Sequence, residues 1–262
     1  RDVLGSRGLG DVYKRQSLNG GFNMEKHTVS ASLTDNTKYM NRALPVKKSF
    51  DIIERTLIIG GQNSAFYFID GFTKDEIMLK LIDSFLNISA DDMPEDATSF
   101  STSCIPYVEV DILGDFDSIF KNLLSGVTCL FIDGYEAAIA IDCRTYPSRS
   151  IEEPDKDKSL RGSRDGFVET IVFNTALMRR RIRDPHLIME MYEAGTSTRT
   201  DIALCYMSDR VDRELLTTIQ NKLEESKSQD LKMSQQSLAE ALFQRKWYNP
   251  FPKYKFTERP DT

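Results

Sequence analysis

The spacing of apolar positions along the first half of the chain predicts short strands and helices in turn. Residues 55–72 read as strand, turn and strand, with Gly60, Gly61 and Asn63 at the turn. In chain order, the elements that follow are a helix over 74–88, a strand over 107–113, a short helix over 115–126 ending at Gly126, and a second hairpin over 127–147 turning at Asp133–Gly134. This order predicts a compact α/β unit over about 50–147.

Two polar segments of this half show no clear periodicity. Residues 24–48 are irregular and read as a loose arm, and the acidic, Ser/Thr-rich residues 91–103 read as a loop. Both hairpins contain the motif FIDG followed by an aromatic residue, at 68–72 and 131–135. Because the two copies sit differently within their hairpins, we interpret them as a hint of strand chemistry and nothing more.

The second half reads as a separate unit after a charged connector over 150–164. The predicted elements are a helix over 165–183, a second helix over 186–195 capped by Gly195, a strand over 198–207, and helices over 212–226 and 234–246. The fold class is therefore α/β, with two small α/β subdomains that have mixed sheets and are joined by the connector. The expected divisions are a leader foreign to the protein over 1–23, an arm over 24–49, subdomains over 50–148 and 149–249, and the start of a linker over 250–262, with Met24 as the natural first residue.

The helix predicted over 165–183 carries a group of arginines. At 100° per residue, Phe167, Ile171, Met178 and Ile182 share one face, which we expect to be buried. Asn174 lies on the same face and needs a hydrogen-bonding partner there. Three arginines lie away from this face, namely Arg179, Arg180 and Arg183. A fourth, Arg181, borders it.

Several roles remain open for these arginines and for Arg161 and Arg164 before them. The first is a solvated face. Cations in the last turn interact favourably with the helix dipole and stabilise the helix by about 0.3–1 kcal/mol each, and such a face could also form ion pairs with acids of the connector, such as Glu152 and Glu153. The planar guanidinium also suits fixed pairing with carboxylates between domains or subunits. Phosphate or anionic lipid headgroups are a third reading. Nucleic acid is the weakest, because aromatic side chains for base stacking do not interleave here.

Composition narrows the functional classes. The chain has 262 residues, 40% of them hydrophobic, which is enough for a core. Its net charge of -6 argues against general binding of nucleic acid. Four widely spaced cysteines without a C-x-x-C pair suggest buried free thiols in a reducing compartment. No signal peptide is visible after Met24, and the longest apolar runs are of strand size.

The sequence offers no catalytic constellation, and we expect neither an enzyme nor a metal or cofactor site. The two histidines are too few for a multi-histidine metal site, and no phosphate-cradling glycine motif occurs. Residues 155–166 imitate a calcium loop, but Leu160 stands where glycine is required and Gly166 where the bidentate glutamate is required.

Long sequence blocks resemble the GerA family of spore germination proteins, A-subunit type. These blocks are DGYEAAIAIDCRTYP, SRSIEEPDKDKSLRGSRDGFVETIVFNTALMRRRIRDPHL, GTSTRTDIALCYM and NPFPKYKFTERPD, in this order. The form of the second block is most similar to the stage V sporulation protein AF branch. The resemblance implies a soluble N-terminal region of two α/β subdomains on the cytoplasmic, spore-core side of the spore inner membrane. It also implies a missing multi-helix membrane domain, and complexes that respond to germinants and release ions.

Two functional hypotheses follow. The first is a module that assembles and couples a spore membrane complex, with other subunits of that complex as partners in a homo- or hetero-oligomer. The candidate assembly or interdomain residues are Glu152, Glu153, Arg161, Arg164, Glu169, Asn174, Arg179, Arg180, Arg181 and Arg183. The alternative is a module that binds an amino acid or a nucleotide in a cleft between the two lobes.

Overall fold

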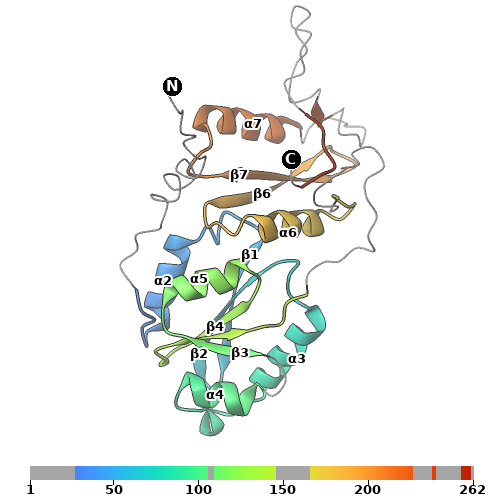
Figure 1. Cartoon of the computed structure of the whole chain (residues 1–262). Helices are drawn as coiled ribbons and strands as arrows, with labels where there is room; N and C mark the ends of the chain where they lie inside the picture. Colours follow the sequence, from blue (N-terminus) through green and yellow to red (C-terminus); the bar gives the residue numbers. More distant parts are fainter. Residues whose placement is uncertain (1–26, 106–108, 146–165, 227–237, 240–254, 261–262) are drawn as a thin grey trace, which may run out of the picture.

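The computed structural model describes residues 27–105, 109–145, 166–226, 238–239 and 255–260. Residues 27–145 build one sheet with helices on both faces, and residues 166–226 build a smaller sheet with two helices. Figure 1 shows the smaller unit, with α6, β6, β7 and α7, stacked above the larger one. No helix in the described ranges has the length and apolar character needed to cross a bilayer.

The larger sheet has five strands in the order β1-β2-β4-β5-β3. The strands are β1 (Ile52–Ile59), β2 (Gln62–Ile69), β3 (Val110–Leu113), β4 (Thr128–Ile132) and β5 (Ala138–Ile141). β2 and β4 pair through Ala65 and Phe131, which joins the two predicted hairpins into one sheet. β4 is buried along its whole length, as expected for a central strand covered on both faces.

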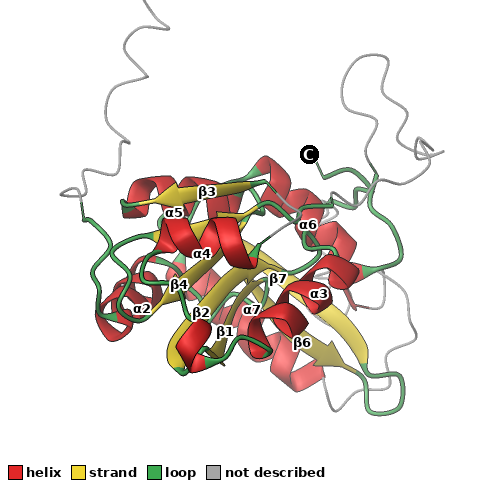
Figure 2. Ribbon diagram, turned by 90° about the horizontal axis from the view of Figure 1, so that it is seen from below, coloured by secondary structure: helices red, strands yellow, loops and turns green. Residues whose placement is uncertain are grey.

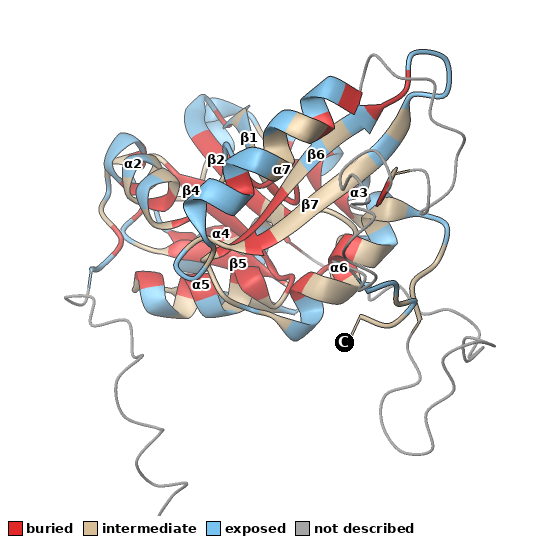
Figure 3. Cartoon of the chain, turned by 90° about the horizontal axis from the view of Figure 1, so that it is seen from above, coloured by how far each residue is buried: buried red, intermediate tan, exposed pale blue. Residues whose placement is uncertain are grey.

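Helices cover both faces of this sheet (Figure 2), and buried side chains form a separate core on each face. On one face lie α2 (Leu33–Ala43) and α5 (Phe116–Leu124), and on the other lie α3 (Asp75–Leu86), α4 (Ala97–Cys104) and a 3-10 turn (Ala90–Asp92). The side chains of Phe66, Phe85 and Phe100 fill the second core, with ring centroids 5.3–5.9 Å apart. Figure 3 shows buried segments along the strands of the larger sheet and on parts of the helices.

The smaller unit consists of α6 (Ile171–Arg181), the antiparallel pair β6 (Leu187–Ala194) and β7 (Thr200–Met207), and α7 (Arg213–Ser226). Ile188, Tyr206 and Leu216 form the small core between the strands and α7. The α/β class is confirmed. Every strand pairing in the described residues is antiparallel, however, so the expected mixed sheets are replaced by antiparallel ones.

Both hairpins, the helices around 74–88, 115–126 and 212–226, and the strands around 107–113 and 198–207 form as predicted. The helix expected over 186–195 is wrong, because β6 occupies this segment and pairs with β7 from Leu187–Met207 to Ala194–Thr200. Gly195, with φ of +87°, allows the turn that follows the strand and caps no helix. The helix expected over 234–246 falls almost entirely outside the described residues.

Two segments read as irregular are helical. The arm over 24–49 contains α2, whose Met40 is fully buried against the sheet and whose N-cap Ser32 accepts a hydrogen bond from the Asp35 backbone. The loop over 91–103 contains α4, capped by Asp96 and anchored by the buried Phe100. In both cases the capping residue determines where the helix begins, and tertiary packing of one apolar side holds it.

Candidate functional site

Arg179, on the last turn of α6, is completely buried where the two units meet. Its guanidinium contacts Asp51 of the larger unit in a fork: Nε lies 2.7 Å from Asp51 Oδ2, and Nη2 lies 3.2 Å from Asp51 Oδ1. The guanidinium also donates to two backbone carbonyls, from Nη1 to Asp184 at 3.0 Å and from Nη2 to Leu187 at 3.0 Å. The side chain therefore ties the start of β1 to the loop between α6 and β6.

Asp51, which binds this guanidinium, belongs to a short stretch, Lys48–Asp51. This stretch runs along the first residues of β6. The Ser49 hydroxyl donates to Asp51 Oδ1 and accepts from the Met189 backbone N–H at 3.0 Å. The Phe50 backbone N–H donates to the Met189 carbonyl at 3.0 Å. The side chain of Asp51 is 1% exposed. We name the contacts among Ser49, Phe50, Asp51, Arg179 and Met189 the seam.

The seam places a full ion pair in a nearly dry environment. Removing two charges from water costs several kcal/mol per ion, and only good geometry with further hydrogen bonds offsets this cost. Here both oxygens of Asp51 and all three nitrogens of Arg179 have partners. The arrangement suits a fixed relative position of the two units better than it suits stability alone.

Cys205 of β7 lies close enough to the seam for Asp51 and Arg179 to act on its charge. Burial, together with the Asp51 carboxylate, raises the pKa of the Cys205 thiol to about 11. The thiol is therefore neutral at physiological pH, which makes it a poor nucleophile.

The first FIDG motif supports the seam from the side of the larger unit. The Asp70 backbone N–H donates to the Asp51 carbonyl at 2.8 Å. Gly71 has φ of +79°, and a Cβ at this position would lie 3.1 Å from both Ala176 Cβ and Val172 Cγ1 of α6. Glycine thus permits both the turn and the close approach of α6.

The second FIDG motif performs a parallel task at α2. Asp133 Oδ1 accepts a hydrogen bond from the Leu33 backbone N–H at 2.9 Å, and the Gly134 N–H donates to the Ala31 carbonyl at 2.7 Å. Each copy therefore ends a strand and fixes the position of a helix. These contacts give a physical basis to the recurrence of the FIDG motif in the two hairpins.

A second polar cluster lies beside the seam, around Glu190 of β6. Its carboxylate accepts hydrogen bonds of 2.7–2.8 Å from Tyr192, Tyr206 and Gln220, and lies 3.5 Å from Lys48 Nζ of the larger unit. Burial alone would raise the pKa of Glu190, but these hydrogen bonds and Lys48 hold it below its usual range. Glu190 is therefore a charged anchor for Lys48.

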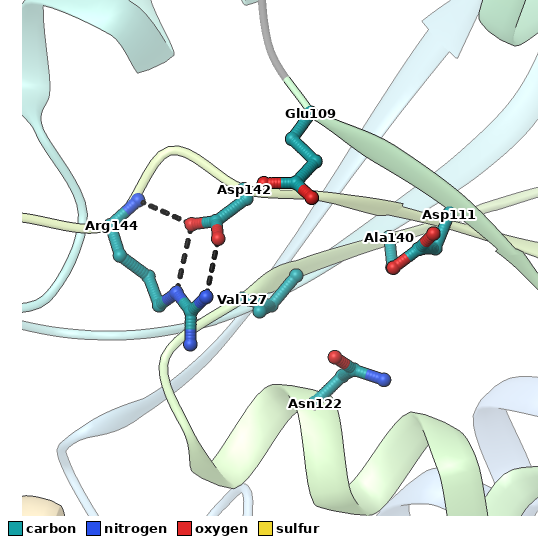
Figure 4. A pocket seen from close by; sticks show the side chains of 7 residues that line it. All are labelled: Glu109, Asp111, Asn122, Val127, Ala140, Asp142 and Arg144. Carbon is teal, nitrogen blue, oxygen red and sulfur yellow. Dashed lines mark hydrogen bonds and ion pairs between the residues drawn. The ribbon is translucent and has the colours of Figure 1, made fainter.

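A hollow of about 90 Å³ lies in the larger unit, at the end of β5 (Figure 4). Its polar lining includes Glu109, Asp111 and Asn122, together with Arg144 bound in a fork to Asp142. Hydrogen bonds from Arg144 lower the pKa of the Asp142 carboxyl. The hollow is far smaller than the roughly 300–1,000 Å³ of typical ligand pockets. Within the described ranges, no group of three or more His, Cys, Asp or Glu side chains could hold a metal ion.

The predicted buried face of α6 is wrong. The buried residues are Thr175, Ala176 and Arg179, and the helix begins after Thr170. Arg179, which lies off the predicted buried face but is among the candidate interdomain residues, is therefore at the centre of the interface. Asn174 finds its partners locally: Oδ1 accepts from the Val168 N–H and Nδ2 donates to the Val168 carbonyl, both at 2.7 Å.

The other predicted site residues are not brought into the seam. Glu169, Arg180, Arg181 and Arg183 are exposed. Four of the predicted residues lie outside the described residues: Glu152, Glu153, Arg161 and Arg164. The predicted ion pairs between the arginines and acids of the connector lie there too. Sequence reasoning missed Ser49, Asp51 and Glu190, which no local pattern marks, and it noticed the FIDG motif of Gly71 without its role.

Comparison with known proteins shows what kind of chain this is. The family model described as "Bacillus/Clostridium GerA spore germination protein" matches residues 38–262. The chain belongs to this family. The resemblance seen in the sequence blocks is thereby confirmed.

Relatives within the GerA family support the same assignment. The chain is 32% identical over 238 residues to Stage V sporulation protein AF of Bacillus subtilis (strain 168), which covers 90% of this chain and 48% of that protein. It is 28% identical to "Uncharacterized membrane protein YfkQ" of the same organism, over 89% of this chain and 45% of that protein. This GerA chain thus spans about half the length of the curated relatives it matches.

A solved structure shares the fold. The N-terminal domain of the A subunit of the Bacillus megaterium spore germinant receptor GerK3 matches with a TM-score of 0.64 and 22% identity. The match covers 91% of this chain and 88% of that domain. At this identity the likeness concerns the fold, and it agrees with the α/β architecture described above.

Proposed function

We propose that this chain is the cytosol-facing N-terminal region of a spore inner-membrane germination protein. In this proposal it joins with other subunits and couples a complex that responds to germinants and releases ions. Family membership supports the germination role, and the names of two relatives, one a membrane protein and one a sporulation protein, support the setting. The additional length of those relatives would carry the membrane domain.

The observation that carries the coupling role is the buried Arg179–Asp51 pair. A seam that only held two units together would be served as well by apolar side chains, which often replace a buried ion pair without loss of stability. A forked pair with every polar atom satisfied fixes one relative position and loses most of its energy when that position changes. Such an interface transmits a displacement of one unit to the other.

The alternative function, binding of an amino acid or nucleotide between the lobes, has less support. Arg179 and Met189 are fully buried in the seam, and among the described residues the hollow of about 90 Å³ lies elsewhere, within the larger unit. A thermal-shift screen with amino acids and nucleotides tests this alternative. A reproducible rise in melting temperature with one ligand class would favour it over the coupling role.

The coupling role is tested in sporulating cells that carry the complete gene. Asp51→Asn is introduced on its own and in combination with Arg179→Met, and complex recovery from spores and the germination rate are measured. We expect slower germination with Asp51→Asn even in spores that contain normal amounts of the protein. Germination at the wild-type rate in such spores would refute the role of the seam.

A control variant separates this effect from a general loss of charge. Asp35 pairs with Lys38 on the exposed surface of α2, with side chains that are 65% and 73% exposed. Asp35→Asn removes the same carboxylate chemistry at a distance from the seam. It should leave germination unchanged.

A further inference from the structure

The outward face of α6 differs in chemistry from the face buried in the seam. At 100° per residue, Phe173, Arg180 and Arg181 lie on the side of the helix opposite Thr175 and Arg179. Phe173 is 45% exposed, although it is a large apolar side chain, and Arg180 and Arg181 are both exposed. Apolar and cationic groups therefore share one exposed face.

Two neighbouring segments extend this face. Arg183, just beyond the helix, is exposed, and its Nε–H donates to the Arg180 carbonyl at 3.4 Å. Residues 255–260 lie beside α6 in Figures 1, 2 and 3, held by a hydrogen bond of 2.7 Å from the Phe167 N–H to the Glu258 carbonyl. Lys255 and Phe256 of this segment are exposed, Phe256 by 49%.

We name this region the α6 surface; it consists of Phe173, Arg180, Arg181, Arg183, Lys255 and Phe256. The exposed acids nearest to it in sequence are Glu169 and Glu258. Asp184, next to Arg183, adds a third, partly exposed carboxylate, with a side chain that is 36% exposed. The four cations of the surface outnumber these three carboxylates, although the chain as a whole carries a net charge of -6. The three arginines lie at the C-terminal end of α6, and Lys255 lies in the segment bound near its N-terminal end through Phe167, so the excess of positive charge extends along the helix.

We propose that the α6 surface rests on an anionic lipid bilayer. Exposed aromatic rings beside long cationic side chains match the boundary between headgroups and acyl chains, where the rings enter and the guanidinium groups meet phosphates. The acidic remainder of the chain is repelled by the same bilayer, so attraction and repulsion together orient the unit. Lipid phosphates would add to the interactions that Arg180 and Arg181 make within the chain.

This inference rests on the proposed function, which places the protein at a membrane. It adds the surface through which the chain contacts the bilayer. Residues 255–260 are the last stretch that the structure describes, and they lie beside α6. A membrane domain that followed this stretch would start next to the α6 surface. The short tether would keep the contact at high effective concentration, so modest intrinsic affinity is sufficient.

The test uses the 262-residue chain with sedimented vesicles, either of phosphatidylcholine alone or with 30 mol% phosphatidylglycerol, in about 0.1 M salt. We expect binding to the anionic vesicles only. Each cation near such a surface contributes roughly 5-fold, so Arg180→Ala, Arg181→Ala and Arg183→Ala combined should lower partitioning by about 100-fold. A control of equal charge change combines Arg55→Ala, Arg199→Ala and Arg213→Ala, which are exposed elsewhere, and should alter binding much less.

Two further variants identify the partner. Replacing Arg180, Arg181 and Arg183 by lysine should preserve vesicle binding, because a lipid surface accepts point charges, whereas a contact with fixed carboxylates of a protein would weaken. Phe173→Ala should lower partitioning, and the matched pair Leu79→Ala with Leu86→Ala, exposed on α3, should not. Circular dichroism confirms that each variant is folded.

Three results would overturn the inference: no binding to anionic vesicles, equal losses in the α6 and control arginine variants, or a lysine variant that binds as poorly as the alanine variant. None of these results touches the seam. The germination test of Asp51→Asn therefore remains an independent measure of the proposed function.

Discussion

Removing the charge of Asp51 should destabilise the protein more than removing any surface carboxylate. In Asp51→Asn, the side chain keeps its size but presents an amide where Arg179 requires an anion. Arg179 is 0% exposed, so its charge cannot turn to water. Breaking a buried pair by removing one partner costs about 3–5 kcal/mol, and for a chain of this size such a loss corresponds to a fall in melting temperature of roughly 10 °C.

The measurement is urea unfolding followed by far-ultraviolet circular dichroism, with Asp35→Asn as the control. The Asp35–Lys38 pair is exposed and 3.7 Å long, so its loss should cost less than about 1 kcal/mol. The double variant Asp51→Leu with Arg179→Met should be less destabilised than the sum of the single variants, because it leaves no unpaired charge. It will not regain full stability, since the Asp184 and Leu187 carbonyls lose their donor.

The result that would refute this reasoning is specific. If Asp51→Asn and Asp35→Asn had equal unfolding free energies, Arg179 would have to be hydrated or paired elsewhere. If the double variant lost as much as the two single variants together, the two side chains would not be coupled. Either outcome would remove the physical basis for a coupling seam.

Three further predictions concern packing, charge and local order. Gly71→Ala should cost about 1–3 kcal/mol more than Gly134→Ala in urea unfolding, because both have positive φ but only Gly71 faces atoms of α6, at 3.1 Å, whereas nothing lies within 4 Å at Gly134. Because the pKa of Glu190 is lowered in the folded chain, its carboxylate stabilises the fold above the ordinary pKa of 4.5 and stops doing so as pH falls through the folded value. The destabilisation by Glu190→Gln should thus be present at pH 7 and shrink below pH 4.5, and a loss that did not vary with pH would contradict this. Asn174→Ala removes both hydrogen bonds to Val168, so hydrogen exchange at the Val168 amide should accelerate by roughly 10-fold, while exchange in the β4 core should not change.

The sequence predicted those elements whose signals are local. The two hairpins, α5 and α7 have apolar spacing, capping residues and glycines that act within a few positions, and all form near the expected bounds. α2 and α4 also carry such signals, in Ser32 and Asp96, but their overall polarity concealed them. A prediction that gave more weight to these capping residues would have included both helices.

Two failures have a non-local cause. Residues 186–195 fit either a helix or a strand by apolar spacing, and the pairing with β7 and burial of Leu187–Met189 decide for a strand. Arg179 falls outside the predicted buried face of α6 because a charged residue counts as polar in any periodicity. Its partner, Asp51, lies 128 positions earlier, so no local pattern could reveal that the charge is neutralised inside.

The small extent of the seam strengthens the case for coupling. The larger unit reaches β6 through one short stretch, in which Ser49 and Phe50 bind Met189 and Asp51 binds Arg179, with Lys48 reaching Glu190 beside them. These hydrogen bonds depend on direction and fail within about 1 Å of displacement. A rotation of the smaller unit would therefore break them together and leave two charges buried without partners. Two positions separated by such a cost would behave as distinct states, which is the property that the proposed coupling role requires.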